Sequence, residues 1–477
     1  MTGRIKYICL LTTAILASCT QTPYFEGAYG TGPIYPDYID VTIPPGIAPL
    51  NFTYTSEGAE KAVTTFTCGE SSFTFKGRNV EWRERDWRRL LSAGTDIAVC
   101  STNPDTMWTI HVSRDSIDYG IAYRLLSPGY ETAGAMGIYE RNLSSFRQTA
   151  ILENTQFDCC MNCHSFNSCN PEDVSIHIRG GHAGTLIRKD GRITAYSTNT
   201  DSTLAACVYP YWHPSGNYIA YSTNETRQCF HIESTHILDV YDIASDILVY
   251  DINGNCLITA PGISSDSIWE NFPAFSPDGR WLYFCSCPAK VIPDELTETK
   301  YNLCRVSFDP ATGTFGSEVE TVVDARSIGM NVAFPRPSYD GKYIMYTMFG
   351  YSTFPIWHND ADLWIYNLET GDNYPAAAAN SDGPEGYHSW SSNSRWFVFG
   401  SRRDDGRYTR AYIGHISEDG VCDKPFMLPQ QHPLSYYAVH NRSFNIPEFI
   451  TGPVLLDNIE AEKVILSENR TNFGFRR

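Results

Sequence analysis

The chain has 477 residues, with 30 Tyr, 24 Phe, 10 Trp and a formal net charge of −18. This length exceeds one typical domain, and the aromatic-rich composition, punctuated by 35 Gly and 27 Pro, favours strands over long helices. The negative charge argues against nucleic acid as a partner, because nucleic-acid binding requires a clustered basic surface.

The first residues are typical of an export signal. Arg4 and Lys6 precede an apolar run, which ends in the small-residue pattern of a lipoprotein cleavage box at Cys19. We therefore expect residues 1–18 to be removed and Cys19 to be acylated, which anchors the protein stably to a membrane. An ordinary cleaved signal peptide is the alternative. Thr20 stands where an aspartate would favour the inner membrane, so we expect an outer-membrane lipoprotein, periplasmic or surface-facing.

Two segments are expected before the main body of the protein. Residues 19–41 are rich in Gly, Pro and Tyr and are predicted to form a tether. Residues 42–148 contain short runs of strand-forming residues, and Trp108, Ile110 and Val112 fall on one face by the period of two. This pattern predicts a small β-sandwich domain.

Residues 149–177 contain the motif C-x-x-C-H, formed by Cys160, Cys163 and His164. At this spacing two cysteine sulfurs can bond the vinyl groups of one haem while the histidine reaches its iron. Cys159 and Cys169 crowd the same stretch, so a disulfide-rich loop or a zinc-holding loop are the alternatives. The motif predicts one covalent haem c, with His164 as the proximal ligand.

The clearest internal signal is a repeat of turn and strand. Segments 211–221, 275–284 and 337–346 share a tight turn followed by an alternating strand, and 390–399 is a worn copy. Asp-Gly or Ser-Gly permits the positive φ that such a turn needs. The turn positions 216, 279, 341 and 394 are 63, 62 and 53 residues apart, which fits four-stranded propeller blades. We expect five to seven blades, six being preferred, over residues 178–440, with 441–477 as a C-terminal extension.

The repeats resemble the blades of TolB-like propellers, with Ser276 to Phe284 as the closest copy. The chain also resembles a Bacteroidetes family of TolB-like lipoproteins, often labelled cytochrome c biosynthesis proteins, in the segment Cys159 to Phe166. Further resemblance lies in Tyr123 to Glu131, Ser389 to Asp405 and Phe444 to Phe449. The resemblance implies an all-β, TolB-like fold and an envelope location.

The second axial ligand of a haem would come from elsewhere in the chain. His177 looks like the first position of a family pattern H-x-R-x-x-x-x-G-T and is the preferred residue, with His182 and Met161 as lesser options. Arg179 is expected to pair with a haem propionate, since a guanidinium binds carboxylates bidentately. A structural, hydrogen-bonded role is the alternative for both His177 and Arg179.

Thirteen cysteines remain after Cys9 and Cys19 are set aside. An oxidising compartment permits disulfides, and three pairings are expected: Cys68 with Cys100, Cys207 with Cys229, and one among Cys285, Cys287 and Cys304.

A peptidase domain would need a G-x-S-x-G elbow and on the order of 200 further residues, so a hydrolase is not expected. The sequence predicts a haem protein with an electron-transfer or haem-dependent role in the envelope, next to an envelope protein partner. The alternative is a haem-free TolB-like interaction scaffold that binds envelope proteins or glycans.

Overall fold

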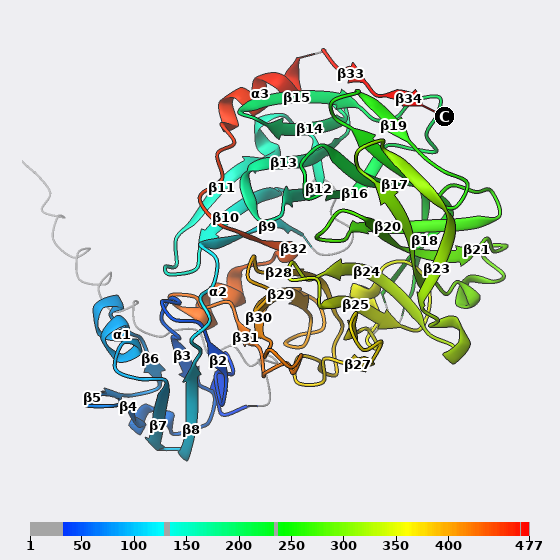
Figure 1. The fold of residues 1–477 in the computed structure, drawn as a ribbon. Coiled ribbons are helices and arrows are strands. Elements are labelled where there is room, and N and C mark those ends of the chain that lie inside the picture. Colours follow the sequence, from blue (N-terminus) through cyan, green and yellow to red (C-terminus); the bar gives the residue numbers. More distant parts are fainter. Residues whose placement is uncertain (1–31, 128–133, 233–236, 468, 477) are drawn as a thin grey trace, which may run out of the picture.

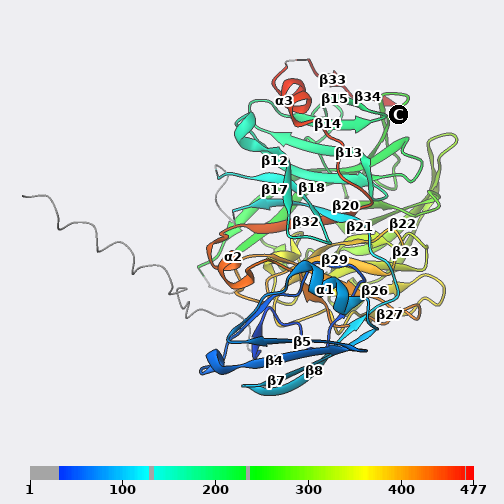
Figure 2. The same ribbon diagram turned by 90° about the vertical axis from the view of Figure 1, so that its left-hand side faces the viewer.

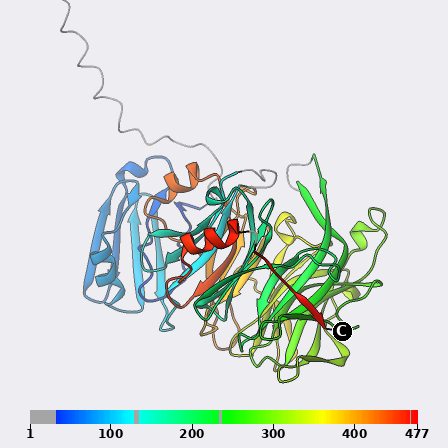
Figure 3. The same cartoon turned by 90° about the horizontal axis from the view of Figure 1, so that it is seen from above.

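The computed structural model describes residues 32–127, 134–232, 237–467 and 469–476. The chain folds into a small N-terminal β domain and a large ring of sheets, which lie side by side (Figures 1 and 3). In the described residues no helix has the length and apolar character needed to span a bilayer. The predicted fold class, an all-β propeller of about six blades preceded by a small β-sandwich, is confirmed.

The N-terminal domain consists of two packed sheets. The first contains β1 (Ile34–Tyr35), β3 (Phe52–Tyr54) and β6 (Asn79–Val80); the second contains β2 (Thr42–Ile43), β8 (Asp105–Val112), β7 (Asp96–Thr102), β4 (Val63–Cys68) and β5 (Ser71–Lys76). Helices η1 (Ala59–Lys61) and α1 (Glu84–Leu91) complete it. Phe52 of the first sheet packs against Phe66 and Trp108 of the second, at ring-centroid distances of 6.3 and 6.0 Å. This aromatic contact makes the domain a sandwich.

Six four-stranded antiparallel sheets form the ring in the part of the chain that the structure describes. Their strands, from the inner to the outer edge, are as follows. Blade 1 contains β32 (Ser443–Ile450), β9 (Gly120–Leu126), β10 (Gly137–Asn142) and β11 (Gln148–Glu153), and blade 2 contains β12 (Cys160–Asn167), β13 (Asn170–Arg179), β14 (Gly184–Lys189) and β15 (Arg192–Ser197). Blade 3 contains β16 (Cys207–Trp212), β17 (Tyr218–Phe230), β18 (Leu238–Asp251) and β19 (Cys256–Ile258), and blade 4 contains β20 (Ile268–Phe275), β21 (Trp281–Pro288), β22 (Asn302–Asp309) and β23 (Thr314–Val323). Blade 5 contains β24 (Asn331–Pro337), β25 (Tyr343–Phe349), β26 (Asp362–Asn367) and β27 (Asn373–Pro375), and blade 6 contains β28 (Glu385–Trp390), β29 (Trp396–Ser401), β30 (Arg410–His415) and β31 (Phe426–Met427).

Short helices connect these strands. They are η2 (Asn154–Gln156), η3 (Leu296–Glu298), η4 (Arg326–Ile328), η5 (Pro355–Trp357), α2 (Pro433–Val439) and α3 (Asn458–Leu466).

The boundaries of the ring differ from the predicted ones. The propeller begins at Gly120, inside the segment 42–148 that was assigned to the small domain, and C-x-x-C-H lies within blade 2 rather than ahead of the ring. Strand β32, expected to belong to a C-terminal extension, is the inner strand of blade 1 and pairs with β9. A closing strand of this kind comes from the far end of the chain, so local patterns do not reveal it.

The repeated turns connect the inner strand of a blade to its second strand. Gly216, Gly279 and Gly341 have φ values of 69, 70 and 73°, and Ser394 adopts a φ of 59° in the worn copy. In three of these turns a serine hydroxyl contacts the Asp or Asn two residues later and accepts the backbone N–H five residues later: Ser276, Ser338 and Ser391. Each copy of the sequence repeat therefore encodes the same turn.

The C-terminal segment adds a fifth strand to two blades (Figures 1 and 2). Strand β33 (Thr471–Asn472) pairs with β15 of blade 2, and β34 (Gly474–Arg476) pairs with β19 of blade 3. Between these strands, Phe473 is 5% exposed and stacks on Tyr250 at a centroid distance of 3.8 Å. The segment thus clips the outer edges of blades 2 and 3 together.

The N-terminal domain packs against blade 6, on the side of the ring away from the C-terminal clip (Figure 2). Polar contacts join the two parts at its rim. His415 of β30 contacts Asp115 and Asp423 at 2.8 Å each, and Lys424 contacts Asp37 at 2.8 Å. These hydrogen bonds to the two carboxylates raise the pKa of His415, although burial opposes them.

Candidate functional site: the axial end of the propeller

The innermost strands share an irregularity where they face the propeller axis. Each of the six strands shifts register against its neighbour at one place, and β12 shifts at a second place near its end; such a shift marks a β-bulge. In five blades the bulge residue has a φ between 47 and 53°: Tyr209, Phe272, Phe334, Tyr387 and Ile446. Four of these side chains meet across the axis, and successive ring centroids lie 4.7, 4.1 and 5.1 Å apart. Together they close the channel.

The C-x-x-C-H motif occupies this position in blade 2. Trp390 of blade 6 donates from Nε1 to the carbonyl of Arg336 at 2.8 Å, and Trp212 of blade 3 donates to the carbonyl of Ser165 at 3.1 Å. Ser165 is thus the blade-2 counterpart of Arg336, and His164 precedes it as Pro335 precedes Arg336. Cys163 then occupies the position of the bulge residue.

The surroundings of two histidines support this alignment. His164 lies against the backbone of Ile446 and Ala122 in blade 1, and His388 lies against the backbone of Phe334 and Met345 in blade 5. Burial, followed by the charge of Arg124, lowers the pKa of His164 to about 3, so the imidazole is neutral at physiological pH. The segment Cys163 to Phe166 (C-H-S-F) is therefore the blade-2 counterpart of Tyr387 to Trp390 (Y-H-S-W) in blade 6.

The motif residues do not surround a space that could hold a haem. Cys160 packs its sulfur 3.6 Å from that of Met136, and His164 is 2% exposed. Neither they nor Cys163 line the main cavity. No group of three or more His, Cys, Asp or Glu among the described residues is placed to hold a metal ion. The packing of these residues does not fit a covalent haem in this fold, so we favour the haem-free alternative over the haem that the motif predicts.

Intact mass decides this prediction. We expect mature protein, produced in a host with haem-attachment machinery, to have the mass of polypeptide plus lipid and to lack the α band of a reduced c-type haem. The physical reason is that Cys160 and Cys163 are held on a packed strand. A Cys160→Ser, Cys163→Ser variant is the control for background colour. A thioether-linked haem would contradict this expectation and restore the redox interpretation.

The expected disulfides are not formed. All thirteen cysteines in the described part of the chain are free thiols. The strand register explains one case, because Cys100 lies opposite Thr65 rather than Cys68. Likewise, Cys207 of β16 lies opposite Thr223 of β17, whereas Cys229 lies farther along β17 and pairs with Asp239 of β18.

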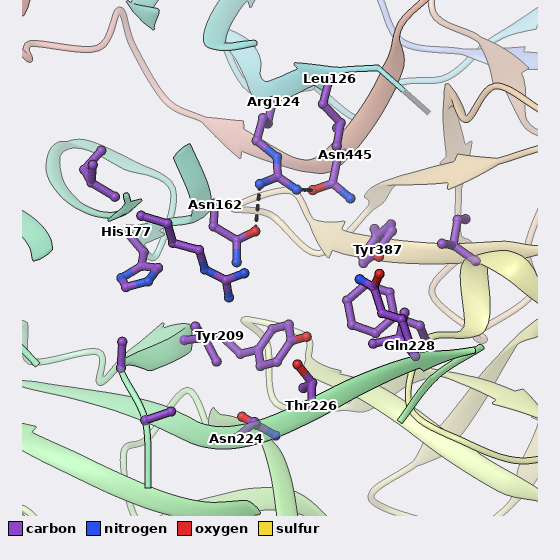
Figure 4. Close-up of a pocket in the computed structure, with 18 of the residues that line it drawn as sticks. Arg124, Leu126, Asn162, His177, Tyr209, Asn224, Thr226, Gln228, Tyr387 and Asn445 are labelled. Atoms are coloured by element: carbon purple, nitrogen blue, oxygen red, sulfur yellow. Dashed lines mark hydrogen bonds between the residues drawn. The ribbon is translucent and has the colours of Figure 1, made fainter. Parts of the chain in front are cut away.

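A cavity of about 600 Å³ lies at this end of the inner strands, and the bulge residues Tyr209 and Tyr387 line it (Figure 4). Blades 1, 2, 3 and 6 and the segment around η5 form its wall. Five aromatic side chains line it, together with five amides and three arginines: Tyr209, Phe354, Trp357, Tyr387, Phe444, Asn162, Asn199, Asn224, Gln228, Asn445, Arg124, Arg179 and Arg402. No Asp or Glu is among the described lining residues, although the chain carries 54 of them.

Two of the cavity's arginines are buried without a carboxylate at ion-pair distance in the described residues. Arg402 is 4% exposed, its Cζ lies 3.2 Å from the ring centroid of Trp357, and burial lowers its pKa to about 9. Arg124 is 8% exposed and contacts only oxygen atoms of a carbonyl and two amides. Burying a cation without a counter-ion costs several kcal/mol, so this cavity favours an anion.

The structure brings two of the predicted residues, His177 and Arg179, to this cavity. His177 contacts Thr185 Oγ1 at 3.2 Å from Nδ1, burial lowers its pKa to about 3, and the Arg179 side chain is exposed. Cys19 and the signal segment 1–18 lie outside the described residues. Sequence reasoning missed Arg124 and Arg402, since neither belongs to a motif. Both fall within stretches of family resemblance, Arg124 in Tyr123 to Glu131 and Arg402 in Ser389 to Asp405.

The strand topology defines the class of protein: a six-bladed β-propeller whose inner strands close around a cavity at one end of the axis. No protein-family model matches the chain, and no curated protein matches it.

Solved structures with similar folds include a protein described as a TolB from Agrobacterium tumefaciens, at 12% identity and a TM-score of 0.38 over 66% of this chain and 89% of that one. They also include an oligogalacturonate lyase from Vibrio parahaemolyticus, at 12% identity and a TM-score of 0.37 over 61% of this chain and 70% of that one. A hypothetical selenium-binding protein from Sulfolobus tokodaii has 10% identity and a TM-score of 0.41 over 85% of this chain and 96% of that one. At these values the similarities carry no argument about activity.

Proposed function

We propose that this protein is a haem-free binding propeller that takes an acidic glycan fragment in the axial cavity. The observation that carries the proposal is a pair of buried arginines, Arg124 and Arg402, with no carboxylate at ion-pair distance in the described residues, in a described lining that contains no acidic side chain. A volume of about 600 Å³ lies within the range of sites for small molecules.

Aromatic and amide side chains support a sugar rather than an inorganic anion. Tyr209, Phe354 and Tyr387 offer apolar faces to the C–H surfaces of a pyranose ring, and Asn224 and Gln228 offer partners for hydroxyl groups. Lipid anchoring through Cys19 at the outer membrane belongs to the same proposal, and it would place the cavity among envelope glycans or proteins.

Calorimetry with two matched disaccharides tests the proposal. The acidic probe is glucuronate linked to N-acetylglucosamine, and the neutral probe is di-N-acetylchitobiose. We expect the acidic probe to bind at least about tenfold more tightly, because a charge-assisted hydrogen bond contributes about 1.5–3 kcal/mol.

Arg402→Met should remove most of that preference, whereas Arg407→Met, which changes an exposed arginine outside the cavity, should leave it unchanged. Equal affinity for both disaccharides, or no binding of the acidic one, would refute the proposal.

A further inference from the structure

We propose that Arg124 is a positioning residue that turns the cavity into a surface of hydrogen-bond donors. This inference rests on the proposed function for its ligand and deepens it, because it states how an acidic group would be distinguished from a neutral one.

Arg124 on β9 connects two blades through the side chains of two asparagines. Its Nη1 donates to Asn162 Oδ1 at 2.7 Å and to the carbonyl of Met161 at 2.8 Å, and its Nη2 donates to Asn445 Oδ1 at 2.6 Å. Asn162 lies on β12 of blade 2 and Asn445 on β32 of blade 1. Figure 4 shows both amide oxygens turned towards the guanidinium.

The chemistry of the guanidinium determines which way these amides face. Arginine has five N–H donors and no acceptor, so only the oxygen of an amide can meet it favourably. The oxygen and nitrogen of an amide lie on opposite sides of the same carbon. With each oxygen held by Arg124, the two NH₂ groups must face away from it, and both asparagines line the cavity.

Other side chains add donors to the same wall. Arg402, like Arg124, carries only N–H donors, and the hydroxyl of Tyr387 can donate as well as accept. Asn162, Tyr387 and Arg402 therefore all bring donor groups to one cavity.

A surface of donors selects a ligand that only accepts. A carboxylate has two oxygens and about four lone-pair sites and no donor, whereas a hydroxyl must also place a proton. An ammonium group has only N–H donors, so it could not accept hydrogen bonds from this lining and would bind poorly. The ligand class that this lining favours is the carboxylate of an acidic sugar.

A stability cycle without ligand tests the orientation. Asn445→Asp places a carboxylate oxygen on Arg124, so we expect little loss in melting temperature, at most about 2 °C. In an Arg124→Met background the same substitution buries an unpaired carboxylate, and we expect a drop several times larger. Arg124→Gln, which removes the charge but keeps a polar side chain, serves as the second background if the methionine variant does not fold. Equal shifts in wild type and variant would overturn the inference.

Binding supplies the second readout. Asn162→Asp keeps an oxygen on Arg124 and replaces the NH₂ group that faces the cavity with an acceptor. We expect this substitution to weaken the binding of the acidic disaccharide at least about tenfold and to change the affinity for the neutral one little. Asn162→Ser, which removes the amide but adds no charge, should give an intermediate loss. If Asn162→Asp binds the acidic probe as tightly as the wild type does, Arg124 does not determine whether the cavity wall presents donors or acceptors, and the inference is wrong. Should the wild type not bind this probe, the proposed function fails, and the stability cycle still decides the role of Arg124.

Discussion

A chain that ends at Arg442 should not fold. It lacks β32, whose residues Phe444, Phe449 and Ile450 are at most 1% exposed and pack in the core. Each large core side chain contributes about 2–5 kcal/mol, and the free energy of unfolding of a whole domain is about 5–15 kcal/mol. Without β32, blade 1 keeps three strands, and the inner edge of β9 is open. We expect insoluble protein or a broad, non-cooperative melting curve.

A chain that ends at Asn469 is the matched control, because it removes β33 and β34 but keeps β32. It should remain soluble and melt cooperatively at a lower temperature than the full chain. If the chain ending at Arg442 melts as the control does, β32 does not close the ring in solution.

Phe473→Ala should lower the free energy of unfolding by about 3–5 kcal/mol, since it empties a buried aromatic site between two blades. Phe473 is 5% exposed, stacks on Tyr250 and lies 5.3 Å from the ring centroid of Tyr196, so three strands of two blades lose contact at once. Denaturant unfolding followed by near-ultraviolet circular dichroism measures the change.

Thr471→Ala, at an exposed position of the same segment, should stay within about 0.5 kcal/mol of the wild type. A loss within about 0.5 kcal/mol in both variants would mean that the segment contributes through its backbone pairing rather than through the Phe473 side chain.

The site itself shows why local motifs and tertiary structure give different answers. C-x-x-C-H was singled out because its spacing suits haem, yet in the fold Cys163 and His164 fall at the bulge of an inner strand. The segment Y-H-S-W in blade 6 contained a signal that could have revealed that C-H-S-F is part of an inner strand. His388 and His164 are both followed by Ser and an aromatic residue. Cys160 lies three residues earlier on the same strand, and its sulfur packs near Met136.

The amino-acid sequence by itself determined the strand-rich class, the repeated turns at Gly216, Gly279 and Gly341, and the small β domain, because these depend on residues close together in the chain. Only the tertiary structure decided that β32 closes blade 1 and that Arg124, Asn162, Tyr387 and Arg402 share one cavity. These four residues come from three blades and are separated by up to 278 positions. Ring closure brings these residues together. A periodic pattern along the chain does not predict which side chains will face each other across the axis, because those contacts join residues far apart in the sequence.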